Sequence, residues 1–255
     1  MHEPLLEIDG LTKRFGGVVA SDSIALAVAP GELHAIIGPN GAGKTTLIGQ
    51  LTGEVAPDAG RIRFGGTDIT RLATHRRSLM GLARSFQVTS LFLDFTALDN
   101  AALAVQAHAG HSFRFWRNAR GEASLREPAR KALARVGLAE RANAIVASMS
   151  HGEHRQLEIA MALATAPRML LLDEPMAGMG PEESQRMVAL LRELKGEVTI
   201  LLVEHDMEAV FALADRITVL VYGRVIACDT PAVVRGDAEV RRAYLGEQEA
   251  VTRHG

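Results

Sequence analysis

The stretch GPNGAGKTT at residues 38–46 limits the possible folds of this chain more than any other feature. It matches the pattern G-x-x-x-x-G-K-[ST], with Gly38, Gly43, Lys44 and Thr45 in the fixed positions. The apolar run before it is typical of a buried strand, and the residues after it predict a helix. This order places backbone N–H groups and the positive end of a helix dipole around one anion. We therefore expect a nucleotide site in which Lys44 reaches the β- and γ-phosphates and Thr45 offers its hydroxyl to Mg²⁺.

The composition is that of an ordinary globular protein. The chain has 255 residues, of which 47% are hydrophobic and 23% charged. Its 28 basic and 30 acidic residues leave a net charge of −2, which gives no overall attraction to nucleic acid or anionic lipid. The single cysteine, Cys228, excludes an internal disulfide and favours a reducing compartment. We see no signal peptide and no run near the roughly 18 apolar residues of a membrane helix, so we expect no membrane span.

Two kinds of strand pattern indicate an α/β fold with a mixed sheet. Near-continuous apolar runs, typical of parallel strands buried on both faces, occupy residues 33–37, 168–173 and 197–205, each followed by a predicted helix. Partly alternating runs at 5–9, 18–28 and 60–64 predict an antiparallel portion, and 216–228 predicts two more strands that turn at Tyr222-Gly223. The sequence therefore predicts a doubly wound core with an antiparallel β portion near its start.

The middle of the chain is different, because helical patterns fill residues 96–166 and strand-like runs are absent there. We expect a helical insert with a loop from Gly110 to Gly121. Two short helices are predicted to close the chain, at about 231–235 and 237–245. The expected organisation is a single domain over 5–245, with a core at about 5–90 and 167–245, a helical subdomain at about 91–166 and a polar tail at 246–255.

A second group of residues suits phosphate chemistry. The run LLLDEP at 170–175 is an apolar strand that ends in two acids. An acid at such a strand end helps to hold Mg²⁺ in P-loop nucleotide hydrolases, which makes Asp173 the candidate. Glu174, next in the chain, is the candidate general base that polarises the attacking water.

The segment after Met149 predicts a helix start that can face a phosphate. Ser150 and Glu153 have the spacing of a capping box, so Ser150 should cap the helix that follows. Free N–H groups and the helix dipole then favour an anion there. Glu153 brings a negative charge to this end. It either weakens the phosphate contact or is neutralised by Arg155, and the sequence leaves both readings open.

This segment resembles the signature motif of the ABC (ATP-binding cassette) ATPases, usually written LSGGQ, since the chain has MSHGE at 149–153. The resemblance implies that Ser150 to Glu153 contact the γ-phosphate of an ATP held by another subunit. It also implies that Gln87 links the core to the helical insert and senses Mg²⁺, and that His205 is the switch histidine that contacts the γ-phosphate. Phe15 matches the aromatic residue that stacks on adenine, unless its ring belongs to the core.

Further segments resemble the ATPases of branched-chain amino-acid importers, namely 13–20, 85–92, 150–164, 173–179 and 243–247. This resemblance implies an ATPase that powers import of branched-chain or related amino acids from the cytoplasmic face of the cell membrane. Its implied partners are two integral-membrane permease subunits, a second ABC ATPase (a paralogue or a copy of itself) in a head-to-tail dimer, and indirectly a periplasmic or extracellular substrate-binding protein. Such importers usually pair two different ATPases, which favours a heterodimer.

Other readings stay open. The cargo can instead be a urea, an aromatic acid or an exported lipid. An ABC ATPase that acts on nucleic acid or ribosomes is disfavoured by the near-neutral charge, so we expect no nucleic-acid partner. FRFWR at 113–117 can be loop packing, a contact with a membrane subunit or a nucleic-acid stack. AGMG at 177–180 lacks the acid of the commoner SALD, which bears on coupling between the two ATP sites. Arg76 and Arg77 are predicted to lie on a solvated helix face.

The candidate site residues form three sets. For ATP they are Phe15, Gly38, Pro39, Asn40, Gly41, Ala42, Gly43, Lys44, Thr45, Thr46, Ser150, His151, Gly152 and Glu153. For Mg²⁺ they are Thr45, Gln87 and Asp173, and for catalysis Glu174, His205 and Gln87.

Overall fold

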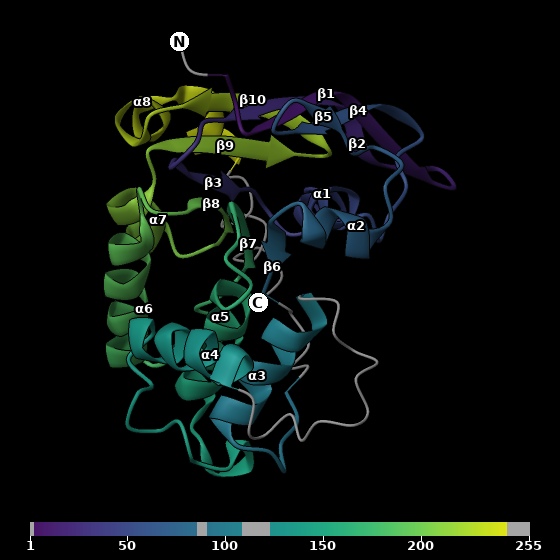
Figure 1. Cartoon of the computed structure of the whole chain (residues 1–255). Coiled ribbons are helices and arrows are strands. Elements are labelled where there is room, and N and C mark those ends of the chain that lie inside the picture. The colour runs from purple at the N-terminus through teal and green to yellow at the C-terminus, as the bar shows by residue number, and fades with distance from the viewer. Residues whose placement is uncertain (1–2, 86–90, 109–122, 244–255) are drawn as a thin grey trace. The chain divides into compact units, whose positions relative to one another are not determined.

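A computed structural model describes residues 3–85, 91–108 and 123–243. These residues fall into two compact units (Figure 1). The first combines the chain up to Arg77 with the chain from Leu194 onward, and the second runs from Ser78 to Glu193. Among the described residues, no helix has both the length and the apolar character that crossing a membrane requires.

The first unit contains an antiparallel sheet with strand order β2-β1-β4-β5. Its strands are β1 (Leu6–Phe15), β2 (Val18–Val28), β4 (Ala59–Phe64) and β5 (Thr67–Asp68). In β4 the last four residues alternate between buried and exposed, as expected for a strand with one solvated face.

The same unit contains a second, mixed set of strands in the order β10-β9-β3-β8. These are β3 (Leu33–Ile37), β8 (Thr199–Val203), β9 (Arg216–Val221) and β10 (Arg224–Asp229). β3 pairs in parallel with both β8 and β9, while β9 and β10 form an antiparallel hairpin. All residues of β3 and β8 are buried, which explains their continuous apolar sequences. This unit contains the helices α1 (Lys44–Thr52), α7 (Met207–Leu213) and α8 (Pro231–Gly236), and α2 (Thr74–Leu79) begins in it and ends just beyond its boundary at Arg77.

The second unit is mainly helical. It contains α3 (Ala97–His108), α4 (Ala123–Arg135), the short 3-10 helix η2 (Val146–Ser148), α5 (His151–Leu163) and α6 (Pro181–Leu194), which ends at the boundary with the first unit. α3, α4 and α5 pack against one another. A parallel pair of strands completes the unit, formed by β6 (Leu82–Arg84) and β7 (Met169–Asp173).

The predicted α/β fold with a mixed sheet and an antiparallel portion is confirmed, while several boundaries differ. β1 continues to Phe15, because β2 pairs with it beyond Asp9 as far as its last residue. The strand predicted at 197–205 is limited to β8, and β6 was not predicted at all. The loop expected from Gly110 to Gly121 and the FRFWR segment lie outside the described residues.

The prediction of a solvated face is wrong for Arg77, although Arg76 is exposed. The Arg77 side chain is only 2% exposed. Its guanidinium donates hydrogen bonds to the carbonyl oxygens of Gln50 and Leu51 at 2.7 Å each, and to two more in the 70–72 turn. The first two acceptors lie in the last turn of α1, where carbonyl groups lack partners within the helix. The buried cation therefore caps the C-terminal end of α1.

Candidate nucleotide site

The loop between β3 and α1 is shaped by glycines that no other residue can replace. Gly43 has a left-handed backbone with φ +103°, and a Cβ there would lie 2.2 Å from the carbonyl oxygen of Ala20. A Cβ at Gly38 would lie 2.1 Å from the carbonyl oxygen of Leu220. Cβ atoms do not lie this close to other atoms in real structures. The backbones of β2 and β9 therefore leave no room for a side chain at the two fixed glycines of the loop.

The start of α1 is left open to an anion. Gly43 occupies the N-cap position and carries no side chain that could cap the first turn, which also contains no acid. Lys44 is 8% exposed, and its Nζ donates hydrogen bonds to the carbonyl oxygens of Gly38 (2.6 Å) and Pro39 (3.0 Å). The ammonium group is thereby held over the loop whose backbone amides are expected to bind phosphate. This geometry fits the phosphates of a nucleotide.

The other loop residues are placed by the same turn. Ala42 is buried, its N–H donates to the carbonyl oxygen of Pro39, and its own carbonyl accepts from Gly223 N–H. Asn40 and Thr45 are exposed, so their side chains are accessible to a ligand. Thr46 is half-buried in the first turn of α1.

Phe15 lies at the end of β1 and is 52% exposed, so its ring is not part of the core. The Nζ of Lys13 lies 5.4 Å from the centre of the ring. A solvent-facing aromatic with a cation beside it is suited to stacking on a base.

His205 belongs to the same unit and follows β8. Its side chain is 67% exposed and its backbone N–H donates to Oε2 of the buried Glu204 at 3.0 Å. Asp206 caps α7 by accepting from Ala209 N–H, which fixes the chain direction just after the histidine. Gln87 lies outside the described residues.

The two consecutive acids lie in the second unit. Asp173 ends β7, is 3% exposed, and forms an ion pair with Arg84 of β6 at 3.2 Å. Glu174 is half-buried and adopts φ +50°, a backbone region that is uncommon for residues other than glycine. Such backbone strain often accompanies functional positions. Arg84 is a site residue that sequence reasoning missed, since a three-residue strand carries too little pattern to be recognised.

The predicted capping box at the start of α5 is present. Ser150 Oγ accepts from Glu153 N–H at 3.2 Å, and a Glu153 carboxylate oxygen accepts from Ser150 N–H at 2.8 Å. Glu153 is neutralised by Arg141 at 2.7 Å and not by Arg155, which instead pairs with Glu158. Partial burial acts to raise the pKa of Glu153, but hydrogen bonds from Ser150 N–H and Arg141 outweigh it and lower the pKa.

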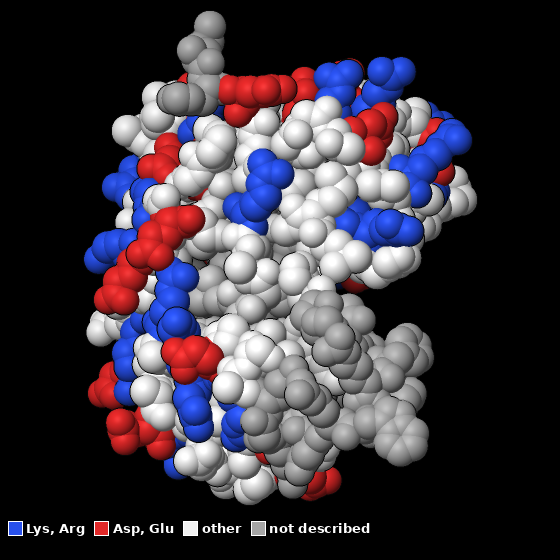
Figure 2. Space-filling view, viewed as in Figure 1, with Lys and Arg blue, Asp and Glu red and all other residues white. Residues whose placement is uncertain are grey.

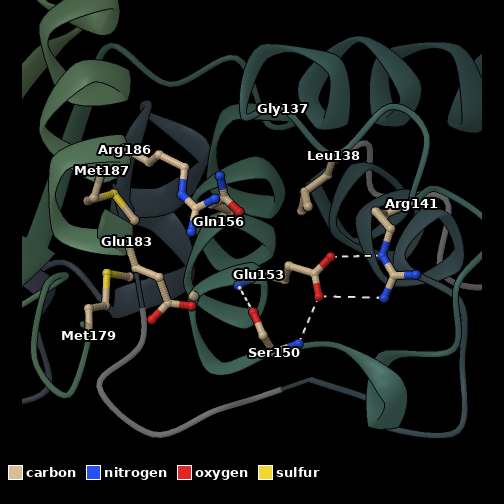
Figure 3. Close-up of a pocket in the computed structure, with 11 residues that line it drawn as sticks. Gly137, Leu138, Arg141, Ser150, Glu153, Gln156, Met179, Glu183, Arg186 and Met187 are labelled. Carbon is tan, nitrogen blue, oxygen red and sulfur yellow. Dashed lines mark hydrogen bonds and ion pairs between the residues drawn. The ribbon is translucent and has the colours of Figure 1, made fainter. Parts of the chain in front are cut away.

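A pocket of about 320 Å³ opens beside this helix start (Figure 3). Glu183 of α6 lines it, and a Cβ at Gly152 would lie 2.6 Å from the Glu183 carboxylate. Gly152 therefore lets the side chain of α6 approach the first turn of α5. His151 adds a second link, since its Nε2 hydrogen-bonds the carbonyl oxygen of Ala177 at 3.2 Å.

Two groups of predicted residues are thus each brought together within one unit. The first unit holds the phosphate loop, Phe15 and His205, and the second holds Asp173, Glu174 and the cap at Ser150.

The sequence matches models of two protein families. The family described as ABC transporter matches residues 21–177, and the family described as branched-chain amino acid ATP-binding cassette transporter matches residues 224–250. Among curated proteins, the chain is 41% identical to the high-affinity branched-chain amino acid transport ATP-binding protein BraF of Pseudomonas aeruginosa, over 97% of this chain and 100% of that one. It is 39% identical to LivG of Escherichia coli K12, which carries the same description, with the same coverage.

Comparison with solved structures leads to the same family. The ADP conformation of MJ1267, an ATP-binding cassette of an ABC transporter, superposes with a TM-score of 0.85 at 29% identity, over 96% of this chain and 100% of that one. A nucleotide-free ATP-binding cassette from an ABC transporter gives a TM-score of 0.83 at 29% identity, over 95% and 99% of the two chains. This chain therefore belongs to the family of ABC transporter ATP-binding proteins.

Proposed function

We propose that this chain is the ATP-hydrolysing subunit of an ABC importer for branched-chain amino acids. The open N-terminus of α1, with Lys44 held over it, is the observation that carries the nucleotide site. The cargo is supported by BraF and LivG, which match the chain along their whole lengths and whose names specify branched-chain amino-acid transport. The proposed domain covers residues 5–245, with a core at about 5–90 and 167–245 and a helical subdomain at about 91–166.

Each site residue has a role in this proposal. Lys44 and the loop amides bind the phosphates, and Phe15 stacks on adenine. Thr45, Gln87 and Asp173 would hold Mg²⁺, which neutralises charge on the phosphates when it is bound. Arg84 keeps the Asp173 carboxylate in place.

Two further residues act on the reacting atoms. Glu174 accepts a proton from the water that attacks the γ-phosphate, and His205 steadies that phosphate. Both are at least partly exposed, so each is accessible to a bound nucleotide.

We also propose a head-to-tail dimer with a second ABC ATPase, for which a paralogue is favoured over a copy of this chain. Ser150 to Glu153 of one subunit then contact the γ-phosphate bound by the other. The capping box and the pairing of Glu153 with Arg141 support this role, because they leave the helix start ordered and its carboxylate compensated. Gly180, which stands where an acid is commoner, removes one polar group from the contact between subunits.

A cluster of exposed apolar side chains in the second unit supports a permease contact. Phe92, Leu93, Phe95 and Ile145 are 55%, 48%, 38% and 43% exposed. Phe92 and Phe95 stack with ring centres 5.4 Å apart. Such a patch is typical of a protein interface. We assign it to the integral-membrane permease pair, at the cytoplasmic face of the membrane, with a substrate-binding protein reached only through the permeases.

A nucleic-acid partner is not supported. Figure 2 shows acidic and basic side chains interspersed over the visible face of the described residues. Several of them are paired, for example Lys13 with Asp58 at 2.8 Å. A nucleic-acid surface would instead gather positive charge.

The hydrolysis assignment is tested with Glu174→Gln in the transporter reconstituted in liposomes. We expect steady-state ATP hydrolysis to fall by about 100-fold or more, because the general base is lost. ATP binding, measured by equilibrium dialysis, should persist. Glu182→Gln, a change of an exposed carboxylate in the first turn of α6, serves as the matched control. Undiminished hydrolysis in the Glu174 variant would remove this residue from the mechanism.

The cargo is tested by uptake of labelled leucine into the same liposomes, loaded with ATP. Competition by isoleucine and valine, but not by urea or aromatic acids, is the expected result. Competition by urea or aromatic acids alone would overturn the cargo assignment and leave the ATPase assignment standing. Copurification from native membranes then identifies the permeases, and copurification with ribosomes instead would contradict the transport role.

A further inference from the structure

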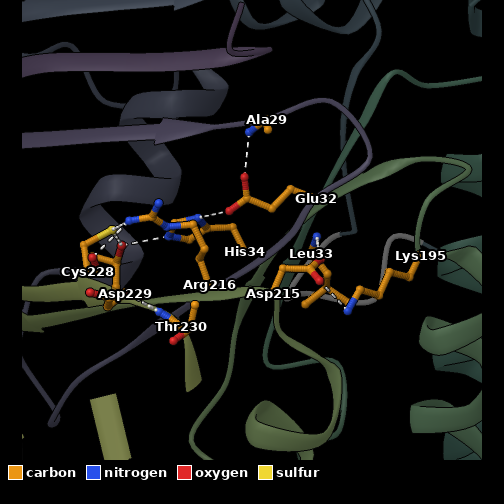
Figure 4. Close-up of polar contacts among 11 residues, drawn as sticks. Ala29, Glu32, Leu33, His34, Lys195, Asp215, Arg216, Cys228, Asp229 and Thr230 are labelled. Carbon is orange, nitrogen blue, oxygen red and sulfur yellow. Dashed lines mark hydrogen bonds and ion pairs between the residues drawn. The ribbon is translucent and has the colours of Figure 1, made fainter. Parts of the chain in front are cut away.

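A chain of polar side chains crosses three strands of the first unit, β3, β9 and β10 (Figure 4). The Glu32 carboxylate, just before β3, lies 2.7 Å from Nδ1 of His34. Nε2 of His34 lies 2.7 Å from the hydroxyl of Thr218 on β9. That hydroxyl donates to Sγ of Cys228 on β10 at 3.2 Å. Cys228 therefore ends an unbroken hydrogen-bonded path that begins at a carboxylate.

Most of this path is buried. His34 and Thr218 are 0% and 1% exposed, whereas Cys228 is half-buried on β10. Ala29 N–H anchors the second carboxylate oxygen of Glu32 at 2.7 Å. Buried polar groups are costly unless they are hydrogen-bonded, and here each group along the path has a partner on both sides.

The directions of the hydrogen bonds limit the protonation states to two. A carboxylate only accepts, so Nδ1 of His34 must carry a proton. In one state, Nε2 accepts from Thr218, and the thiol of Cys228 donates to the Thr218 oxygen. In the other, Nε2 donates to Thr218, and the Thr218 hydroxyl donates to a thiolate. The two states differ by one proton, moved from the sulfur to the imidazole through the hydroxyl.

Arg216 favours the second state. Its Nη2 lies 3.7 Å from Sγ and donates to the carbonyl oxygen of Cys228 at 3.0 Å. A guanidinium only donates, so the sulfur accepts from Arg216 in either state, and a thiolate accepts such a bond better than a thiol does. Other charges nearby are engaged elsewhere, since Asp215 pairs with Lys195 at 2.7 Å and Asp229 accepts from the N–H of the next residue.

We propose that Cys228 and His34 form a thiolate–imidazolium pair, coupled through the Thr218 hydroxyl, which makes Cys228 a site of covalent modification by small soft electrophiles. The sulfur of the half-buried Cys228 is the nucleophile, and the buried imidazolium of His34 holds the proton that the thiol gave up. This site lies outside the nucleotide site and does not depend on the proposed function.

The acid–base properties agree with this geometry. Burial acts to raise the pKa of Cys228, but hydrogen bonding and the charge of His34, together with Thr218 and Arg216, lower it to about 7. Burial acts to lower the pKa of His34, yet its interactions with Cys228 and Glu32 raise it above its usual value.

The reaction with an activated alkyl halide balances simply. The thiolate sulfur of Cys228 forms a bond to the methylene carbon of iodoacetamide while the carbon–iodine bond breaks and iodide leaves. No oxidant or reductant is required, and the proton that the thiol gave up stays on His34.

The test is the pH dependence of iodoacetamide alkylation of the intact chain, followed by mass spectrometry, together with the ultraviolet absorbance of the thiolate. Because the sequence contains one cysteine, every adduct on a thiol reports Cys228, and peptide mapping separates it from adducts on methionine. We expect the rate to reach half its maximum near pH 7, following the thiolate fraction. Thr218→Val should raise this midpoint by about one unit or more, toward the value of about 8.5 of a free thiol.

The matched control is Thr230→Val, the same change two residues beyond Cys228 at a hydroxyl that makes no cap hydrogen bond. It should leave the midpoint unchanged. Glu32→Gln should raise the midpoint, because the imidazolium loses its counter-charge, and circular dichroism checks that each variant is folded. A wild-type midpoint above pH 8, or a midpoint that Thr218→Val leaves in place, would overturn the proposal.

Discussion

At the residue scale, two glycines of the proposed ATP site are required because of what packs against them. Gly43 meets a backbone carbonyl of β2, and Gly152 meets the end of the Glu183 side chain. A backbone atom cannot give way, whereas a flexible side chain can. The two positions should therefore respond differently to alanine.

We expect Gly43→Ala to weaken ATP binding by more than about 10-fold, since both the left-handed backbone and the loop shape are lost. Titration with a fluorescent ATP analogue measures the affinity. Gly17→Ala is the control, because a Cβ there has no neighbour within 4 Å. Equal ATP affinities for the two variants would show that the loop accommodates a side chain at Gly43, which would contradict the prediction.

For Gly152→Ala we expect a loss of about 1 kcal/mol in the free energy of unfolding, as Glu183 is pushed from its place. The double variant Gly152→Ala with Glu183→Ala should recover most of this loss, because the two sites are in direct contact. Urea denaturation of the single and double variants measures the coupling. Strictly additive effects would contradict the contact.

Local motifs made many site residues predictable at this scale, but not their partners. Fixed spacing revealed Lys44 and the Ser150–Glu153 cap. Neutralisation of Glu153 by Arg155, two residues away, was one of two readings that the sequence left open, and the structure pairs Glu153 with Arg141 instead. Side chains that meet across a loop leave no periodic trace in the sequence.

At the element scale, the most informative helix is α1. Its N-terminus is left open for an anion, and its C-terminus is closed by the buried Arg77. A positive charge at the C-terminal end of a helix interacts favourably with the helix dipole. Arg77 therefore stabilises α1 at its C-terminal end, while the N-terminal end stays accessible to an anion.

We expect Arg77→Met to lower the free energy of unfolding by about 2–4 kcal/mol, because buried carbonyl oxygens at the end of α1 lose their donors. Arg77→Lys should retain only part of this free energy of unfolding, since an ammonium group cannot donate to all four carbonyl acceptors of the planar guanidinium. Urea denaturation provides the measurement. Arg76→Met, at an exposed neighbour, should change little, and a similar loss in both variants would contradict the capping role.

Elements with a clear hydrophobic pattern were predictable, and those that depend on pairing with distant strands were not. The fully buried strands β3 and β8 are recognisable in the sequence as continuous apolar runs. The second half of β1 does not, since residues after Asp9 are strand only because β2 and β4 pair with them. β6 has three residues, too few for any period.

At the scale of the whole molecule, carboxylates make stability depend on pH. Burial acts to raise the pKa of Glu32 and of Glu153, but hydrogen bonds outweigh it and lower both below the ordinary value. The unfolded chain then binds protons first as the pH falls. The stabilisation is present above the ordinary carboxyl pKa and is lost as the pH falls through the lowered values.

We therefore expect the melting temperature to fall as the pH drops from about 5 to about 3, through the lowered pKa values, as measured by calorimetry. Glu158 opposes this trend, because burial raises its pKa and its protonation favours the folded state. Glu158→Gln should steepen the fall, whereas Glu153→Gln should flatten it. A melting temperature that rises on acidification would contradict the assignment.

The fold class and the family were predictable because the motifs and their order can be read directly from the sequence. The side-chain contacts between segments far apart in the sequence were not predictable. Cys228 was noted only as a cysteine that cannot form a disulfide, and its path to Glu32 through β9 and β3 appears only after folding.

The phosphate loop is completed from the far end of the chain. Gly38 and Gly43 fit against Leu220 and Ala20, and Gly223 N–H binds the carbonyl of Ala42. A ribosome that has made residues 38–46 has already made Ala20, but it has not yet made Leu220 and Gly223, which also shape the loop. The nascent protein should be unable to recognise ATP until the β9–β10 hairpin has emerged from the exit tunnel, so bound nucleotide cannot guide the folding of the segments that are made before the hairpin.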